Sequence, residues 1–155
     1  MTRSDITVRR AVPEDCPVFA EIEAVSAEQP WNEAQLTEEL SHDFAVLLAA
    51  LRGEEVIGML DMHLTGEAYI NEISVRPDSR RLGAGEALLR AAVRICVERE
   101  QSRIILDVRS RNSAARSLYE KAGFRELCTR KNMYADPEDD GVTYEMDLAD
   151  PERKP

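Results

Sequence analysis

Two arginines followed by two closely spaced glycines form the segment of this sequence with the clearest chemical potential. Arg80, Arg81, Gly83 and Gly85 fall between a predicted strand and the longest predicted helix. Glycine lets a backbone approach a ligand closely, and a helix N-terminus presents unpaired N–H groups that favour phosphate. The segment predicts phosphate binding, although a tight strand-to-helix turn would also explain it. No Gly-Lys-Ser/Thr follows, which excludes a Walker loop.

The histidines and cysteines point to neither a metal centre nor a covalent intermediate. His42 and His63 lack ligand spacing, so we expect no metal site and no histidine base. No Ser-His-Asp or Cys-His arrangement suggests a covalent step, which favours direct transfer between substrates. The three cysteines lie far apart and are odd in number, which excludes a disulfide framework and indicates a reducing, cytoplasmic location.

The elements around the glycine loop can be predicted from local patterns. The strand over residues 68–75 must stop at Pro77, because proline cannot donate to a sheet. Apolar residues at three-and-four spacing predict a helix over residues 83–100, and alternation predicts a strand over residues 103–108. Asn112 is a suitable N-cap for a further helix that ends at Gly123.

The rest of the chain continues this alternation of strands and helices. Further strands are predicted over residues 6–10, 44–51, 56–64, 124–131 and 142–148, with a loop at 135–141 and helices beginning near Pro13 and Asn32. This order indicates a mixed α/β arrangement in which hairpins join the middle strands. The length of 155 residues predicts one domain over residues 1–150 and a charged tail at 151–155.

Charge and hydropathy narrow the classes of partner. The formal net charge of −10 lacks the basic footprint of a nucleic-acid binder. An acidic body suits a basic protein or peptide, although acidity also simply aids solubility. The sequence contains no apolar run long enough for a membrane span, so we expect no membrane partner.

Two sequence blocks resemble the signatures of the GNAT N-acetyltransferases. Residues 75–89, which contain the glycine loop, resemble the acyl-coenzyme A signature Arg/Gln-x-x-Gly-x-Gly/Ala, and residues 112–124 resemble the second signature. The similarity runs roughly from Ile6 to Leu148. It implies the acyltransferase fold of that family, a single mixed, mostly antiparallel sheet flanked by helices, and acetyl-coenzyme A (acetyl-CoA) as co-substrate without a metal.

A narrower resemblance concerns the acceptor. Trp31 with the preceding Gln-Pro, residues 106–109 and residues 130–134 resemble the ribosomal-protein-alanine N-acetyltransferases. This resemblance implies transfer to the α-amine of a protein N-terminus, with ribosomal N-terminal alanine as the leading choice, by a monomer or weak dimer. Other amines, or a non-catalytic module that binds acetyl-CoA, remain open as alternatives.

The resemblance also implies which residues hold acetyl-CoA. In the family, the pyrophosphate lies on backbone amides after the arginine, and the pantetheine arm pairs with the strand that precedes the loop. Carried onto this sequence, the contacts are Ile73, Val75, Arg80, Arg81, Leu82, Gly83, Gly85, Glu86, Asn112 and Tyr119. Asn112 equally has a purely structural role as a helix cap.

Three residues are candidates for the chemistry of amine acetylation. The family's tyrosine at the position of Tyr119 protonates the departing thiolate. Asp107 stands where the narrower family usually has glutamate, and its side chain is one methylene shorter. It acts as a base directly or through one water, or it is a solvated carboxylate beside Arg109. Glu72, on the strand before the loop, is a second candidate base or a plain surface charge.

Trp31 and Tyr134 are the candidate acceptor-binding residues. By the resemblance, Trp31 helps to build the acceptor groove, although a lone tryptophan is more often structural. Tyr134 resembles a tyrosine of the peptide groove. The acidic residues 136–140 attract a basic peptide or form a solvated turn.

Overall fold

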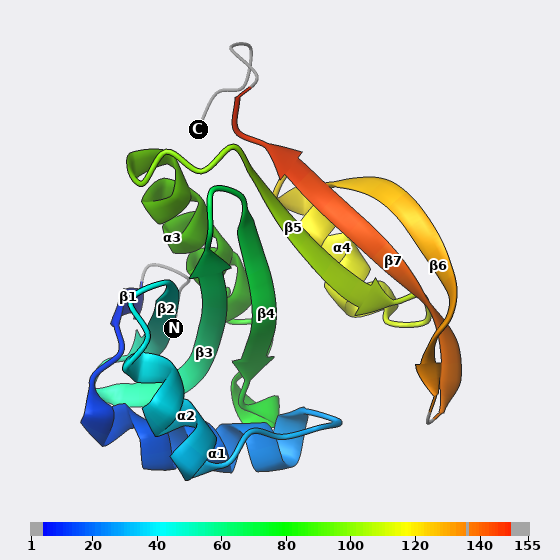
Figure 1. Ribbon diagram of the computed structural model, residues 1–155. Coiled ribbons are helices and arrows are strands. Elements are labelled where there is room, and N and C mark those ends of the chain that lie inside the picture. Colours follow the sequence, from blue (N-terminus) through cyan, green and yellow to red (C-terminus); the bar gives the residue numbers. More distant parts are fainter. Residues whose placement is uncertain (1–4, 136, 150–155) are drawn as a thin grey trace.

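Seven strands form one sheet in the order β1-β2-β3-β4-β5-β7-β6 (Figure 1). The computed structural model describes residues 5–135 and 137–149. The strands are β1 (Ile6–Arg10), β2 (Ala45–Arg52), β3 (Glu55–Leu64), β4 (Ala68–Val75), β5 (Arg103–Arg109), β6 (Arg125–Ala135) and β7 (Glu138–Asp147). The helices are α1 (Cys16–Ser26), α2 (Glu33–Leu40), α3 (Ala84–Glu98) and α4 (Ser113–Lys121).

The sheet is mixed and mostly antiparallel, as expected. β1 to β4 pair antiparallel in sequence order, and β5, β7 and β6 also pair antiparallel. The two halves meet where β4 and β5 run parallel, and this pairing consists of Ala68 with Ile104 and Tyr69 with Ile105. Beyond these pairs the strands diverge, so the sheet opens like a V (Figure 1).

Helices cover both faces of the sheet and bury two apolar clusters. α3 packs Leu88, Leu89 and Cys96 against one face, while α1 and α2 pack Phe19 and Leu36 against the other. β2 contributes alternate residues to each cluster, which explains why it is a continuous apolar run rather than an alternating one.

The capping signals near the site are confirmed. The Asn112 side chain accepts a hydrogen bond from the Ala115 N–H at 3.1 Å, so it caps α4. Gly123 follows α4 with a φ of 103°, the left-handed conformation that glycine adopts without strain.

The predicted loop over residues 135–141 is wrong. β6 continues to Ala135 and β7 begins at Glu138, so a tight hairpin stands there. Two of the acidic side chains hold this hairpin: the Asp140 Oδ1 atom accepts from the Asn132 N–H at 2.9 Å, and Asp139 is buried, whereas Glu138 is exposed. The predicted charged tail, residues 151–155, lies outside the described residues.

No helix within residues 5–135 and 137–149 is long and apolar enough to cross a membrane.

The core position of Leu88 gives a test of this packing. Leu88 is fully buried between α3 and the sheet, so Leu88→Ala should lower the free energy of unfolding by about 2–5 kcal/mol in urea denaturation. Val97 on the same helix is 52% exposed, and Val97→Ala should change the free energy of unfolding by less than about 0.5 kcal/mol. Equal losses in the two variants would contradict the assigned face of α3.

Candidate active site

The glycine loop has the geometry of an anion-binding cradle. A 3-10 turn at Pro77–Ser79 follows β4, and α3 begins after Gly83, which has a φ of 90°. Arg81 also has a left-handed backbone, with a φ of 68°, which is strained for a residue other than glycine. The first turn of a helix leaves N–H groups without intrahelical partners, and Gly83 has no side chain to cap them. These groups favour an anion.

The side chains around the cradle differ in their surroundings. Arg80 and Arg81 are exposed, whereas Leu82 packs against the core. A Cβ atom on Gly85 would stand 3.0 Å from the Leu118 side chain, so glycine lets α3 approach α4 closely. Glu86 is paired with Arg90 at 2.9 Å on the surface of α3.

The end of β4 is open on the side that faces β5. Ile73 and Val75 pair with β3 on one side, and the parallel pairing with β5 on the other side is confined to Ala68 and Tyr69. The open side of β4 beyond Tyr69 can therefore receive an extended, amide-containing ligand, which would share the Val75 carbonyl with the Ser26 hydroxyl that donates to it at 3.2 Å.

Glu72 lies beside the buried carboxylate of Glu23 on α1. Burial, and then the neighbouring Glu23, together raise the pKa of Glu72 to about 8. Glu23 accepts hydrogen bonds from the Ser74 hydroxyl and, at 3.2 Å, from the Trp31 N–H. A base with a pKa near 8 suits proton transfer from an amine at neutral pH.

Tyr119 stands close enough to Glu72 for the two groups to interact. Burial raises the pKa of Tyr119 to about 12, with a smaller contribution from Glu72. Its ring packs against the rings of Tyr144 and Phe124, with centroids 6.0 and 6.2 Å away. The hydroxyl therefore keeps its proton throughout the neutral range.

Both oxygens of Asp107 already accept hydrogen bonds. The Tyr69 hydroxyl donates to Oδ2, and the Thr143 hydroxyl donates to Oδ1 at 2.5 Å. Burial and then Asp107 raise the pKa of Tyr69. Arg109 takes no part in these two bonds; its guanidinium donates to Glu28. Each carboxylate oxygen has two lone pairs, so these bonds orient Asp107 and still leave it able to accept a proton from an amine, directly or through water.

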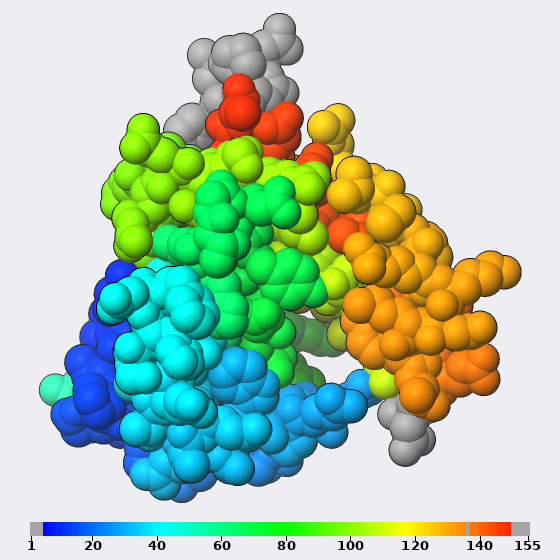
Figure 2. Space-filling view, viewed as in Figure 1, coloured from blue at the N-terminus to red at the C-terminus, as the bar shows by residue number. Residues whose placement is uncertain are grey.

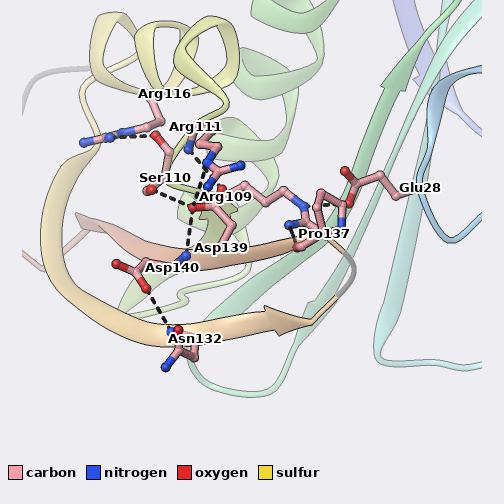
Figure 3. A network of polar contacts seen from close by, with 9 residues as sticks. All are labelled: Glu28, Arg109, Ser110, Arg111, Arg116, Asn132, Pro137, Asp139 and Asp140. Atoms are coloured by element: carbon pink, nitrogen blue, oxygen red, sulfur yellow. Dashed lines mark hydrogen bonds and ion pairs between the residues drawn. The ribbon is translucent and has the colours of Figure 1, made fainter.

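Arg109 joins the connection between α1 and α2 to the β6–β7 hairpin. Its guanidinium lies 2.6 Å from the Glu28 carboxylate and donates to the Pro137 carbonyl at 2.6 Å (Figure 3). It also stacks 4.4 Å from the centre of the Tyr134 ring. We call this contact of Arg109 with Glu28 the arginine bridge. The arginine bridge completes the rim of the opening that Figure 2 shows between β4, the segment after α1 and the hairpin.

Asp139 fixes the hairpin end of this arrangement. Its Oδ1 atom accepts from the Ser110 hydroxyl at 2.9 Å, and Oδ2 accepts from the Arg111 N–H at 3.2 Å (Figure 3). Burial opposes ionisation, but these hydrogen bonds hold the pKa of Asp139 below its ordinary value.

The structure brings most of the predicted site residues together, with Trp31 to one side. Tyr134 lies against the Arg109 guanidinium, and it contributes to the raised pKa of Tyr119. The Trp31 side chain packs against the cluster formed by α1 and α2 and borders a shallow pocket there. Its link to Glu72 runs through its backbone N–H and Glu23.

Sequence reasoning missed the residues that hold the candidates in place. Tyr69 and Thr143 come from strands whose pairing with β5 no local pattern reveals. Glu23 did carry a signal: it follows Phe19 and Ile22 at helical spacing, so a charged residue falls on the buried face of α1.

Comparison with known proteins decides the family. A sequence model of the acetyltransferase (GNAT) family matches residues 14–124. The chain belongs to this family. It is therefore an acetyl-CoA-dependent N-acetyltransferase, as the two signature blocks predicted.

Individual GNAT relatives agree over most of the chain. A relative from Bacillus subtilis (strain 168) is 32% identical over 142 residues, which is 90% of this chain and 94% of the relative. The [ribosomal protein bS18]-alanine N-acetyltransferase of Escherichia coli (strain K12) is 31% identical over 127 residues, 82% of this chain and 84% of the relative. The crystal structure of the ribosomal-protein-S18-alanine N-acetyltransferase from Escherichia coli superposes with a TM-score of 0.85 at 25% identity, covering 97% of this chain and 98% of that one.

The Glu72 carboxyl should make stability depend on pH. Its pKa is about 8 in the folded chain against 4.5 for the ordinary group, so the folded state holds this proton after the unfolded state has lost it. The contribution of Glu72 to stability therefore falls as pH rises from about 4.5 to about 8. In urea denaturation, the stability of Glu72→Gln relative to the parent should rise across this range and then level off. A difference that does not change with pH would contradict the raised pKa.

Proposed function

We propose that this GNAT enzyme transfers the acetyl group of acetyl-CoA to the α-amine of a protein N-terminus. The favoured acceptor is a ribosomal protein that begins with alanine. Two observations support this proposal: the names of the relatives that match most of the chain, and the closed opening beside the candidate site.

The choice of acceptor rests on this opening, which is enclosed on all sides. The opening is bordered by β4, the segment after α1, the arginine bridge and the β6–β7 hairpin (Figure 2). A chain end can enter such an opening, whereas an internal segment would have to enter as a loop of double width. The Asp107 side chain adds negative charge that suits a protonated or basic N-terminal segment, whereas the charge of Glu28 is balanced by Arg109.

The residues present fit acetyl-CoA. The N–H groups at the start of α3, with the exposed Arg80 and Arg81, would hold its pyrophosphate. The open edge of β4 at Ile73 and Val75 would pair with its amide-containing arm. When bound there, acetyl-CoA supplies an activated acyl group and a thiolate leaving group.

Glu72 and Tyr119 then have complementary tasks. An α-amine has a pKa of about 7.7–8.0, so Glu72 with a pKa of about 8 can receive its proton with little energetic cost. Tyr119 keeps its proton at neutral pH and can donate it to the thiolate. Asp107, held by Tyr69 and Thr143, shapes the wall beside the amine and is the second candidate base.

A peptide assay tests the proposal. The purified chain is incubated with acetyl-CoA and a peptide that has a free N-terminal alanine and basic residues after it. We expect the intact mass of this peptide to increase by one acetyl group. A copy with a blocked N-terminus and an internal lysine should stay unchanged.

The other outcomes separate the alternatives. Acetylation of the blocked peptide would show that lysine is the acceptor. No acetylation of either peptide, while acetyl-CoA still binds, would contradict transfer to a protein N-terminus and favour a small-molecule acceptor or a binding module.

The proposed acid gives a second test. Tyr119→Phe removes the hydroxyl and keeps the ring in its contacts with Tyr144 and Phe124. We expect kcat to fall by about 10²–10⁴-fold, while the dissociation constant of acetyl-CoA changes little. Steady-state kinetics and calorimetry measure the two quantities. A variant that keeps the parent's kcat would rule out Tyr119 as the proton donor.

A further inference from the structure

A second group of ionisable side chains lies between β3 and α2. Asp61 and His63 are two residues apart on β3, so their side chains point to the same face of the sheet. Glu39 reaches them from α2: the His63 Nε2 atom lies 2.5 Å from Glu39 Oε2 and 3.9 Å from Asp61 Oδ2. Each of the three residues places a ligand atom within 4.8 Å of the other two.

Asp61 is the member of this cluster that lacks sufficient partners. Its side chain is 0% exposed, and its Oδ2 atom accepts from the Asn71 amide at 3.2 Å. Its Oδ1 atom has no hydrogen-bond partner among the described residues. A buried carboxylate oxygen without a partner is costly and calls for a proton or a cation.

The surroundings of the cluster are short of positive charge. In the part of the chain that the structure describes, His63 is the only ion-pair partner that Glu39 and Asp61 have. The His63 side chain is 32% exposed, so the cluster can be reached from solvent.

We propose that Glu39, Asp61 and His63 form a zinc site that fastens α2 to β3. One imidazole and two carboxylates are ligands that Zn²⁺ accepts, and the solvent side leaves a fourth position for water. Bonds of about 2.0–2.2 Å at tetrahedral angles put ligand atoms roughly 3–3.5 Å apart. The distances of 2.5 and 3.9 Å from His63 bracket this spacing, so small side-chain shifts suffice.

This site differs from the expectation drawn from the sequence. In its own segment, His63 has only Asp61, two residues before it, as a neighbouring ligand. Glu39 comes from another element, so the sequence spacing does not reveal the cluster. The proposal does not depend on acetyl transfer. Zinc here would restrain α2, which begins after Asn32 and carries the Leu36 side chain into the core.

Zinc titration of the full chain, free of affinity tags, tests the proposal. The chain carries Cys128→Ser, because this exposed thiol is a competing zinc ligand. After dialysis against EDTA, ZnCl₂ is added in a calorimeter, and the melting temperature is measured with and without zinc. We expect one zinc ion per chain and a higher melting temperature with zinc.

Three variants locate the bound ion. His63→Ala and Asp61→Asn should each weaken zinc binding more than about tenfold. Asp61→Asn keeps the size of the side chain and removes one acid from the cluster, so it is expected to fold. His42→Ala is the matched control: it removes the only other histidine, which stacks on Phe44 at 4.9 Å, and should bind zinc like the parent.

Two results would overturn the proposal. One is a parent chain that takes up no zinc; a higher melting temperature for Asp61→Asn would then show that a shared proton occupies the cluster. The other is equal zinc affinity in the parent, His63→Ala and Asp61→Asn, which would place the ion elsewhere.

Discussion

β4 and β5 run parallel and pair at Ala68–Ile104 and Tyr69–Ile105, and the site depends on their divergence beyond these two pairs. A sheet that stayed closed would use the backbone of Ile73 and Val75 for its own hydrogen bonds and leave no room for a ligand. The divergence exposes these groups, lets Glu72 and Tyr119 approach from separate elements, and creates the opening that the arginine bridge spans (Figure 2). Proline at position 77 and the glycine loop then turn the chain so that α3 points its N-terminus at the same place.

The face covered by α1 and α2 carries an unusual density of buried acid. Glu23 and Asp61 are fully buried, Glu39 is nearly so, and Glu72 stands opposite Asp61 across β3 and β4. Burial raises the pKa values of Asp61 and Glu72, and the neighbouring carboxyl groups of Glu39 and Glu23, respectively, raise them as well. The fold tolerates the destabilisation caused by these buried acids because the two large apolar clusters on either side of the sheet stabilise it.

Local signals in the sequence predicted most of what a single segment determines. The place of the glycine loop between a strand and a helix, the Asn112 cap, the end of α4 before Gly123 and the mixed sheet are confirmed, because turn chemistry and periodicity specify them. Local patterns could not predict contacts between elements: the pairing of Arg109 with Glu28 joins residues 81 positions apart. The hairpin after β6 was missed for a related reason, since its acidic residues look like a solvated loop until Ser110 and Arg111 are placed beside them.

The arginine bridge has a consequence for the timing of the reaction. An acceptor that reaches Glu72 through a closed opening must enter end first and leave by the same path. Its first few residues must then be extended and free of structure for the whole residence time. Folding or assembly of the acceptor therefore competes directly with its modification, and a mature complex with a tucked-in terminus is out of reach. For the acceptor proposed above, this geometry favours a newly made chain, whose terminus has not yet been buried by folding or assembly.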